Sequence, residues 1–401
     1  MLKNKKIVLG VTGSIAVFKA AALASKLTQL HADLDVILTQ NACKLISPAL
    51  FEGLTHRKCH TDTFENCHDL ASSHVTLGSQ ADLVVIAPCT ANMMAKIAHG
   101  IADDKLSTTM LAAHCPIIIA PAMNCFMYEN PATQENIAIL RRRGITVLEP
   151  GEGPLACGYS ARGRMPEPED LTDIIVQAMA DDKILKNKKV LITAGPTREP
   201  IDAVRFISNP STGKMGYACA KAALIAGAEV TLVTGPTNLK PVHGAQMIPV
   251  QTAEQMYAAV MDAAKTADIV IMSAAVADFT PESPVTSKMH KTDAPLNIPL
   301  KHTQDILKTL GENRQPGQII CGFCMETENL LERAQLKLKN KAVDMIVAND
   351  LNARGCGFAG DTNGVMLVTR ESVRSLEIAD KLDIAREIIR SLAQIRHHEA
   401  G

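Results

Sequence analysis

Lys5-Lys6-Ile7-Val8-Leu9-Gly10 opens a short apolar strand that runs into Thr12-Gly13-Ser14 and a helix-like run over residues 15–30. The same design returns at Lys188-Lys189-Val190-Leu191-Ile192-Thr193-Ala194-Gly195. A basic pair, an apolar run and a Gly/Thr turn are typical of the first strand and loop of a parallel α/β sheet. Two such starts predict two domains, each with its own chemistry.

Composition places the chain among globular proteins of two-domain size. It has 401 residues, 47% of them hydrophobic, and a formal net charge of −1. This balance gives no reason to expect a nucleic-acid or anionic membrane partner. Apolar runs such as 117–122 and 269–277 are too short to span a bilayer, and we expect no signal peptide, because the first residues lead straight into a predicted strand. Eleven cysteines without regular spacing predict free thiols, and we expect a cytoplasmic protein.

Both halves alternate short apolar runs with helical patterns, which predicts two Rossmann-like α/β domains, each a mostly parallel sheet flanked by helices. The charged segment Asp181–Lys188 lies between the halves, so we expect one domain over 1–184 and another over 185–401. Predicted helices include 15–30, 131–143 and 170–180. Predicted strands are 7–11, 35–38, 83–87, 117–120 and 146–148, then 190–193, 229–233, 269–273, 319–323 and 345–348.

The loop Gly10–Ser14 offers backbone N–H groups at a helix start, which suits a phosphate. It lacks the G-x-G-x-x-G spacing, and the second strand ends in Thr39 rather than in an acidic residue that would hold a ribose diol. A mononucleotide phosphate therefore fits better than NAD. A plain strand–helix turn explains the loop equally well.

Two Pro–Asn turns, Ala87–Asn92 and Ala120–Asn124, follow predicted strands. Open α/β sheets bind ligands at the carboxyl ends of their strands, although one such turn alone is common in plain loops. His74 has the chemistry of a base near neutral pH, but a lone histidine is more often structural. Cys157 precedes the run Arg162–Pro168, which is typical of a flap whose guanidinium groups meet an anion.

The second half carries a loop with a P-loop flavour, Ile207–Gly216. Ser208 replaces the first glycine of a Walker A loop, and Met215 replaces the Ser/Thr that binds magnesium. The loop still suits a phosphate or an acyl phosphate, while a capped helix start is the simpler interpretation. Asp278 ends a buried strand, a position suited to a metal–triphosphate. Lysines that offer charge here, each also explicable as a surface residue, are Lys288, Lys291, Lys337 and Lys341.

Ordered motifs carry a resemblance in each half. The first half resembles flavin-containing cysteine decarboxylases through Thr12–Ala16, His74, Ala87–Asn92, Pro121–Asn124 and Ala156–Met165. The second half resembles phosphopantothenate–cysteine ligases through Thr197–Asp202, Ile207–Gly213, Ala274–Asp278 and Gly322–Thr327. The whole chain is similar to the family of bacterial bifunctional coenzyme A biosynthesis enzymes.

The decarboxylase resemblance implies an FMN cofactor that carries most of the chemistry. It implies His74 as the base in oxidation of the substrate's cysteinyl thiol, Asn124 as the partner of the departing carboxylate, and Cys157 as the final proton donor. The implied flavin-binding residues are Gly13, Ser14, Thr39, Thr90 and Asn92.

The ligase resemblance implies that CTP activates 4′-phosphopantothenate to an acyl-cytidylate, which the amine of cysteine then attacks. Asn209 would hold the acyl intermediate, Lys288 would serve the coupling step, and Mg²⁺ would accompany CTP at Asp278. Homo-oligomers are also implied, with trimeric contacts in the first half and dimeric contacts in the second. The implied nucleotide-binding residues are Met272, Ser273, Ala274, Asp278, Lys288, Gln304, Asp305, Ile306, Leu307, Phe323, Lys337 and Lys341.

Three residues depart from the family patterns. Tyr128 stands where the decarboxylases have Trp, His290 lies in an element that is otherwise lysine-rich, and Met325 stands where the ligases usually have Ala. The first keeps aromatic bulk, the second weakens the local positive charge, and the third bears on the packing of the base pocket.

Other functions compete with this interpretation. Cys321 and Cys324 form a CxxC inside an apolar strand, which disfavours redox or zinc chemistry. Cys59-His60 and Cys67-His68 suggest a metal cluster, but we favour unligated side chains. A flavin-binding scaffold protein is the main alternative. An NAD-dependent dehydrogenase is disfavoured by the missing acidic residue after the second strand.

Overall fold

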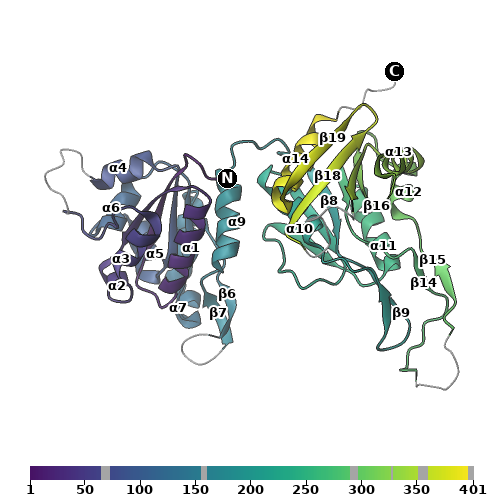
Figure 1. Ribbon diagram of the computed structural model, residues 1–401. Helices are drawn as coiled ribbons and strands as arrows, with labels where there is room; N and C mark the ends of the chain where they lie inside the picture. Colours follow the sequence, from purple (N-terminus) through teal and green to yellow (C-terminus); the bar gives the residue numbers. More distant parts are fainter. Residues whose placement is uncertain (65–72, 155–159, 290–296, 327, 351–359, 396–401) are drawn as a thin grey trace. The chain divides into compact units, whose positions relative to one another are not determined.

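The computed structural model describes residues 1–64, 73–154, 160–289, 297–326, 328–350 and 360–395 (Figure 1). The chain forms two compact units, Met1–Met179 and Ala180–Gly401, which divide just before the charged segment noted in the sequence. Cys157 and its neighbours in residues 155–159 lie outside the described residues, as do Cys67, His68, His290 and Lys291. No helix in the described part of the chain is long and apolar enough to cross a bilayer.

The first unit is built on a parallel five-stranded sheet in the order β2-β1-β3-β4-β5. These strands confirm the five that were predicted, with ends shifted by a residue or two. Their bounds are β1 Lys6–Val11, β2 Asp33–Leu38, β3 Leu83–Cys89, β4 Ile117–Pro121 and β5 Thr146–Val147. The helices are α1 Val17–Gln29, α2 Gln40–Cys43, α3 Pro48–Thr55, α4 Ser73–Gln80, α5 Ala91–His99, α6 Lys105–Ala112, α7 Cys125–Glu129, α8 Pro131–Arg142 and α9 Pro168–Met179.

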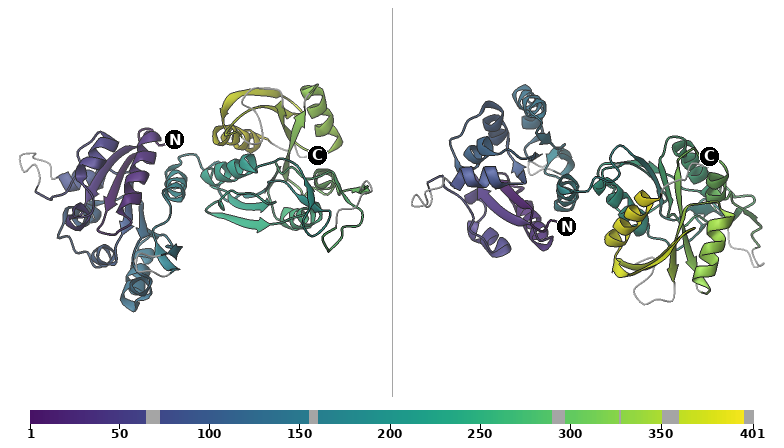
Figure 2. Two further views of the ribbon diagram at one scale, coloured as in Figure 1. Left: turned by 60° about the horizontal axis from the view of Figure 1, so that its bottom comes forward. Right: turned by 90° about the horizontal axis from the view of Figure 1, so that it is seen from above.

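Strands of this sheet are apolar along their length because helices cover both faces. Every residue of β3 is buried. Helix α1 packs with α3 and α9, whereas α5 packs with α6 and α8 (Figure 2). An antiparallel hairpin, β6 Gly151–Pro154 with β7 Ser160–Arg164, was not predicted as strand, because its sequence is Gly-, Pro- and Arg-rich and lacks alternation.

The second unit contains an eight-stranded sheet in the order β12-β11-β8-β13-β16-β17-β18-β19. The first six strands are parallel, and the last two are antiparallel to their neighbours. Its strands are β8 Lys189–Ala194, β11 Glu229–Thr234, β12 Ala245–Pro249, β13 Ile269–Met272, β16 Ile319–Glu326, β17 Met345–Asp350, β18 Thr362–Thr369 and β19 Val373–Asp380. Two small antiparallel pairs are β9 Arg198–Pro200 with β10 Phe206–Ser208, and β14 Phe279–Pro281 with β15 Leu300–His302.

Helices cover both faces of this sheet as well, and they are α10 Lys214–Ile225, α11 Ala253–Ala264, α12 Ile306–Glu312, α13 Leu330–Asn340 and α14 Lys381–Gln394. The α10–α14 face forms one apolar cluster, and the α11–α12–α13 face forms another. Cys321 belongs to the first cluster and Cys324 to the second, because residues three apart on a strand face opposite ways. The two thiols therefore do not meet, and burial raises the pKa of both.

Candidate active sites

Each sheet has a point where its strand order reverses, and there the loops at the carboxyl ends of the strands diverge. The reversal lies between β1 and β3 in the first unit and between β8 and β13 in the second. Open α/β sheets bind ligands in the crevice at such a point. The residues around these two positions therefore form the candidate active sites.

In the first unit, Thr12 joins the loops that follow β1 and β3. Its hydroxyl donates to the Pro88 carbonyl at 2.8 Å and accepts from the Thr90 N–H at 3.0 Å. Thr90 in turn caps α5 by accepting from the Met93 N–H. The sequence assigned a role to Thr90 but not to Thr12, which acts by holding the two loops together.

Gly13 is required by a close approach to α2. A Cβ on Gly13 would lie 2.6 Å from the Asn41 Cβ and 3.0 Å from the Asn41 carbonyl carbon. Thr39 caps this helix through the Ala42 N–H. The structure thus brings Gly13 and Thr39 to one edge of the sheet. Helix α1 begins after Ala16 without a side-chain cap, so this edge suits a phosphate.

The hairpin β6–β7 lies against the turn that carries Asn124. The Met123 N–H donates to the Gly163 carbonyl at 3.1 Å, and a Cβ on Gly163 would lie only 2.3 Å from the Met123 oxygen. Asn124 caps α7 through the Phe126 N–H at 2.9 Å, which fixes its amide. Cys157, which lies outside the described residues, falls between the two strands of this hairpin.

Two polar contacts anchor the hairpin further. Lys19 of α1 is buried and donates to the Met165 carbonyl and to Glu167, both at 2.9 Å. Arg162 of β7 lies 3.2 Å from Glu149. Glu149 also pairs with Arg141 at 2.6 Å. Arg162 was expected to meet an anionic ligand, but its guanidinium has a carboxylate partner within the unit.

Tyr128, at the position where the resemblance led us to expect tryptophan, is buried on α7 and donates its hydroxyl to Glu149 at 3.0 Å. Burial, with the neighbouring carboxylate, raises the pKa of the phenol. Tyr128 therefore combines buried aromatic packing with a hydrogen bond to Glu149.

His74 is half-buried in the first turn of α4. This helix packs against α6 and β1, and no hydrogen bond of the described residues joins His74 to Asn124 or Thr90. Asn92 is exposed in the first turn of α5. Gly13, Thr39 and Thr90 therefore lie at one edge of the sheet. Asn124 lies on a separate turn, and His74 lies on a separate helix, α4.

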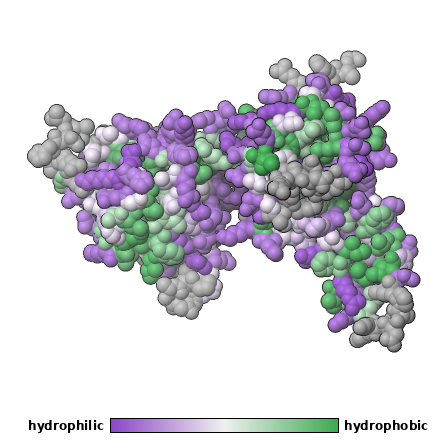
Figure 3. Space-filling model, in the orientation of Figure 1, coloured by the Kyte–Doolittle hydropathy of each residue, from purple (hydrophilic) through white to green (hydrophobic). Residues whose placement is uncertain are grey.

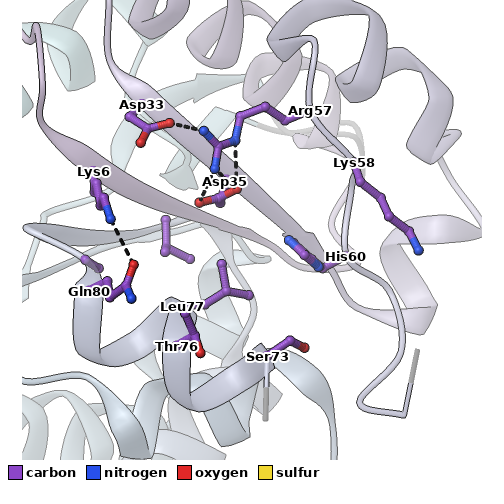
Figure 4. Close-up of a pocket in the computed structure, with 12 residues that line it drawn as sticks. Lys6, Asp33, Asp35, Arg57, Lys58, His60, Ser73, Thr76, Leu77 and Gln80 are labelled. Carbon is purple, nitrogen blue, oxygen red and sulfur yellow. Dashed lines mark hydrogen bonds and ion pairs between the residues drawn. The ribbon is translucent and has the colours of Figure 1, made fainter. Parts of the chain in front are cut away.

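A hollow of about 660 Å³ lies beside α4, β1 and β2 (Figure 4). Arg57 spans it in ion pairs with Asp33 and Asp35. His60 on its wall is held by backbone hydrogen bonds with Val36 and Leu38 of β2. Among the residues that the structure describes, no three potential ligands cluster to hold a metal.

In the second unit, a cavity of about 380 Å³ opens at the carboxyl ends of β13, β16 and β17. It brings together four residues that the sequence predicted as functional: Asn209, Ser273, Ala274 and Phe323. It also contains Met325 and Lys214, the latter from the Ile207–Gly216 loop, and three polar residues that the sequence did not identify: Asn349, Asn363 and Lys381. We call this space the ligase cavity.

Asn209 and Ser273 present polar groups to the ligase cavity. The Asn209 amide donates to the carbonyls of Ala275 and Val276 at 3.2 and 3.1 Å, which fixes its orientation. The Ser273 hydroxyl oxygen is buried without a hydrogen-bond partner among the described residues. A buried hydroxyl of this kind is costly unless a ligand satisfies it.

Asp202 ties the Thr197–Asp202 motif to the segment of Lys288. Its buried carboxylate accepts from the N–H groups of Val204, Arg205 and Met289 at 2.8, 2.7 and 3.2 Å. These hydrogen bonds, the Val204 N–H foremost, hold the pKa of Asp202 below its ordinary value. The sequence assigned no role to Asp202. Its place as the last residue of the Thr197–Asp202 motif was the signal that could have identified it.

Two of the predicted nucleotide-binding lysines lie at the C-terminal end of α13: Lys337 in its last turn and Lys341 as its C-cap. Lys337 donates to the Phe323 carbonyl at 2.8 Å, and Lys341 forms an ion pair with Asp305. Asp305 caps α12 through the Lys308 N–H at 2.9 Å. Phe323 and Asp305 are thereby joined to one face of α13.

Other predicted residues are placed less directly. The Asp278 carbonyl accepts from the Thr303 N–H at 3.0 Å, which puts Gln304 close to Asp278, and the Asp278 side chain is exposed. Met272, Ile306 and Leu307 were predicted to bind nucleotide, but their side chains are buried in the apolar core. Any contact from these three to a nucleotide therefore comes from their backbone. Lys288 is exposed.

Comparisons with known proteins agree across both units. The family model described as "Flavoprotein" matches residues 1–180, and the one described as "DNA/pantothenate metabolism flavoprotein C-terminal domain" matches residues 185–395. The chain is 47% identical over 399 residues to the coenzyme A biosynthesis bifunctional protein CoaBC of Bacillus subtilis (strain 168), and this covers 98% of each chain.

Solved structures resemble the units separately. The C-terminal domain of a coenzyme A biosynthesis bifunctional protein CoaBC is 41% identical, with a TM-score of 0.46, and covers 53% of this chain and 97% of that chain. The FMN-dependent cysteine decarboxylase SpaF is 34% identical, with a TM-score of 0.40, and covers 45% of this chain and 100% of that chain.

Proposed function

Because the chain belongs to the family of coenzyme A biosynthesis bifunctional proteins CoaBC, we propose that its two units act in succession on one substrate. The chain is a phosphopantothenate–cysteine ligase in its second unit and a phosphopantothenoylcysteine decarboxylase in its first. The product of the ligase is the substrate of the decarboxylase. The observation that supports the proposal is that predicted ligase residues come together in one cavity at the carboxyl ends of β13, β16 and β17.

In the ligase unit we propose that CTP activates the carboxylate of 4′-phosphopantothenate. The Asn209 amide, which is fixed by its bonds to two carbonyls, would bond the acyl intermediate, and the Ser273 hydroxyl would bond a polar group of the bound substrates. Lys288 would support the attack of the cysteine amine, with Asp202 anchoring its segment through the Met289 N–H. Phe323, Lys337 and the Gln304–Leu307 turn would hold the nucleotide.

Magnesium would arrive with the triphosphate rather than in a protein cage. The described residues contain no cluster of three metal-binding side chains, and Asp278 offers one exposed carboxylate. Mg²⁺ in nucleotide sites is commonly held by one or two carboxylates together with substrate phosphates. Asp278 fits the role of such a carboxylate.

The first unit fits a flavin mononucleotide at the β1/β3 switch point. Its Gly13 cradle and the uncapped start of α1 suit the phosphate, and Thr39 and Thr90 frame the same edge. When bound, FMN would supply reversible hydride acceptance from the substrate. Asn124 would hold the substrate carboxylate until CO2 departs, His74 would remove a proton from the thiol, and Cys157 would return one to carbon.

We further propose a homo-oligomer, with trimeric contacts in the first unit and dimeric contacts in the second. Large apolar side chains are exposed at Ile15, Phe18 and Phe126 of the first unit. In the second unit, Phe279 and Leu300 of the β14–β15 pair are exposed, and Figure 3 shows apolar surface in this region. Exposed apolar patches of this kind commonly mark interfaces.

The described cysteines form no disulfide with one another, and we propose that the protein acts in the cytoplasm. Purified full-length protein, incubated with 4′-phosphopantothenate, cysteine and CTP, tests both activities together. We expect oxidised-flavin absorbance, pyrophosphate release, CO2 release and 4′-phosphopantetheine by mass spectrometry. Pyrophosphate release without CO2 would refute the decarboxylase assignment alone, and CO2 release only from added phosphopantothenoylcysteine would refute the ligase assignment alone.

A further inference from the structure

Lys19 is a buried lysine of the first unit whose partners lie far along the chain. It stands in the first turn of α1, which begins at the sheet edge formed by Gly13, Thr39 and Thr90, called the phosphate edge below. Its side chain is 7% exposed, and its ammonium donates to the Met165 carbonyl and to Glu167, both at 2.9 Å. A buried ammonium is costly unless it is paired and hydrogen-bonded. These two partners therefore hold segment 165–167 against α1.

Segment 165–167 is the foot of the β6–β7 hairpin. Strand β7 ends at Arg164, immediately before this segment. The Glu167 carboxylate oxygen that accepts from Lys19 also lies 3.7 Å from the Arg164 guanidinium. Arg164 crosses to the other strand, because a Cβ on Gly153 of β6 would lie 2.8 Å from its Nη1. One series of contacts thus links α1 to both strands of the hairpin.

The same hairpin seats the turn of Asn124. Gly163, two residues before Met165, accepts from the Met123 N–H at 3.1 Å and leaves no room for a Cβ between the two backbones. Asn124, the proposed partner of the substrate carboxylate, follows Met123 directly. In chain order the hairpin also carries Cys157 between its two strands. A shift of the foot would therefore move the strand on which the Asn124 turn rests.

A purely structural role for Lys19 is the simpler alternative, in which it only joins two helices. Helix α9 follows the foot of the hairpin and packs along α1 (Figure 1). A second ion pair joins these helices at the surface, between Lys26 and Glu169 at 3.1 Å. The packing of α1 on α9 thus has support of its own, whereas Lys19 reaches past α9 to the segment that carries the hairpin.

We propose that Lys19 is a positioning residue for decarboxylation. Through Met165 and Glu167 it fixes the β6–β7 hairpin, and with it the Asn124 turn, relative to the phosphate edge. The inference rests on the decarboxylase function proposed above and adds to it a residue outside the motifs that carry the resemblance. Reacting groups must be held close to their productive geometry, so loss of this anchor should slow the reaction more than it weakens flavin binding.

Lys19→Met in the full-length chain tests the proposal, because methionine keeps most of the buried side chain and removes the ammonium. With phosphopantothenoylcysteine as substrate, kcat for CO2 release should fall about 10-fold or more, since a misplacement of about 1 Å can cost ~10²-fold. Flavin absorbance per chain should stay at the wild-type value. The ratio of saturated product to CO2, measured by mass spectrometry, should also fall, because the hairpin carries the proposed proton donor Cys157.

The matched control is Lys26→Gln, which breaks the surface ion pair with Glu169 on the same helix. It should change neither kcat nor the product ratio. Adding Glu167→Gln to Lys19→Met should cost little further, because two residues that act as one contact are not additive. Ligation by the same preparations serves as the internal reference.

Wild-type kcat and product ratio in Lys19→Met would overturn the positioning role. So would a fall in kcat that merely follows loss of flavin while the product ratio stays unchanged, because that is the signature of a structural role. If Lys19→Met does not fold, Glu167→Gln replaces it, since this side chain is 40% exposed, and wild-type values there would overturn the proposal instead. A wild-type chain without flavin absorbance or CO2 release would refute the decarboxylase proposal itself.

Discussion

Replacing Gly163 by alanine should separate the β6–β7 hairpin from the Asn124 turn and impair decarboxylation. A Cβ at this position would lie 2.3 Å from the Met123 oxygen and 3.5 Å from the Cys125 nitrogen. Gly163 also has a φ of 153°, where side chains are rarely found. The obstacle is backbone, so no rotamer change relieves it.

The required movement can be worked from these distances. Real Cβ contacts essentially never fall below 3.0 Å, so hairpin and turn must separate by roughly 0.7 Å. That shift strains the Met123–Gly163 hydrogen bond of 3.1 Å. Overpacking of this size costs about 1–3 kcal/mol of stability. Misplacing a catalytic group by about 1 Å can cost ~10²-fold in rate.

The assay measures CO2 release from phosphopantothenoylcysteine, with ligation by the same preparation as an internal reference. We expect Gly163→Ala to lose about 10- to 100-fold in decarboxylation and to ligate normally, because Gly163 and the ligase cavity lie in different compact units. Gly151→Ala is the matched control in the same hairpin, since its Cβ would lie 3.8 Å from the nearest atom, the Arg164 oxygen. Wild-type decarboxylation by Gly163→Ala would refute the reasoning.

Four other changes test individual roles. His74→Asn should keep flavin absorbance while CO2 release falls by ~10²-fold or more, and undiminished release would remove His74 as the base. Cys157→Ser should release CO2 but stall before the saturated product, as mass spectrometry would show, because a hydroxyl is a weaker acid than a thiol. Lys288→Gln should accumulate acyl-cytidylate by slowing coupling ~10²-fold, and a normal rate of phosphopantothenoylcysteine formation would contradict its role. Asp202→Asn should unfold more readily than wild type at pH 7. This difference in the free energy of unfolding should shrink as the pH falls below 3.8 toward the depressed pKa of Asp202, because the wild-type carboxyl then protonates. A difference that stays constant down to pH 3 would argue against a charged Asp202.

Much of the framework followed from local sequence. Apolar runs such as 83–87 and 190–193 became central strands because residues buried on both faces must be apolar along their whole length. Thr39 and Thr90 each follow the last residue of a strand, and each caps the next helix with its side-chain hydroxyl. Their place at the ligand edge was therefore already implied by chain order.

The antiparallel end of the second sheet was not predictable in this way. Strand β19 is exposed or half-buried along its length, so its residues show no clear alternation between apolar and polar. The hairpin β6–β7 is short and rich in glycine and arginine, and its strand character comes from pairing and from its seat on Met123. Pairing with a distant segment leaves little trace in local composition.

Residue order alone was enough to predict two α/β units, their parallel strands and the residue types at the strand ends, because these depend on burial and chain order. Three juxtapositions became visible only in the folded chain: Lys381 and Lys214 line one cavity, Asp202 holds the Met289 backbone, and Gly163 rests on Met123. Each of these contacts joins segments far apart in the chain. Their energies come from charge, burial and close approach in space, which local patterns of residues do not encode.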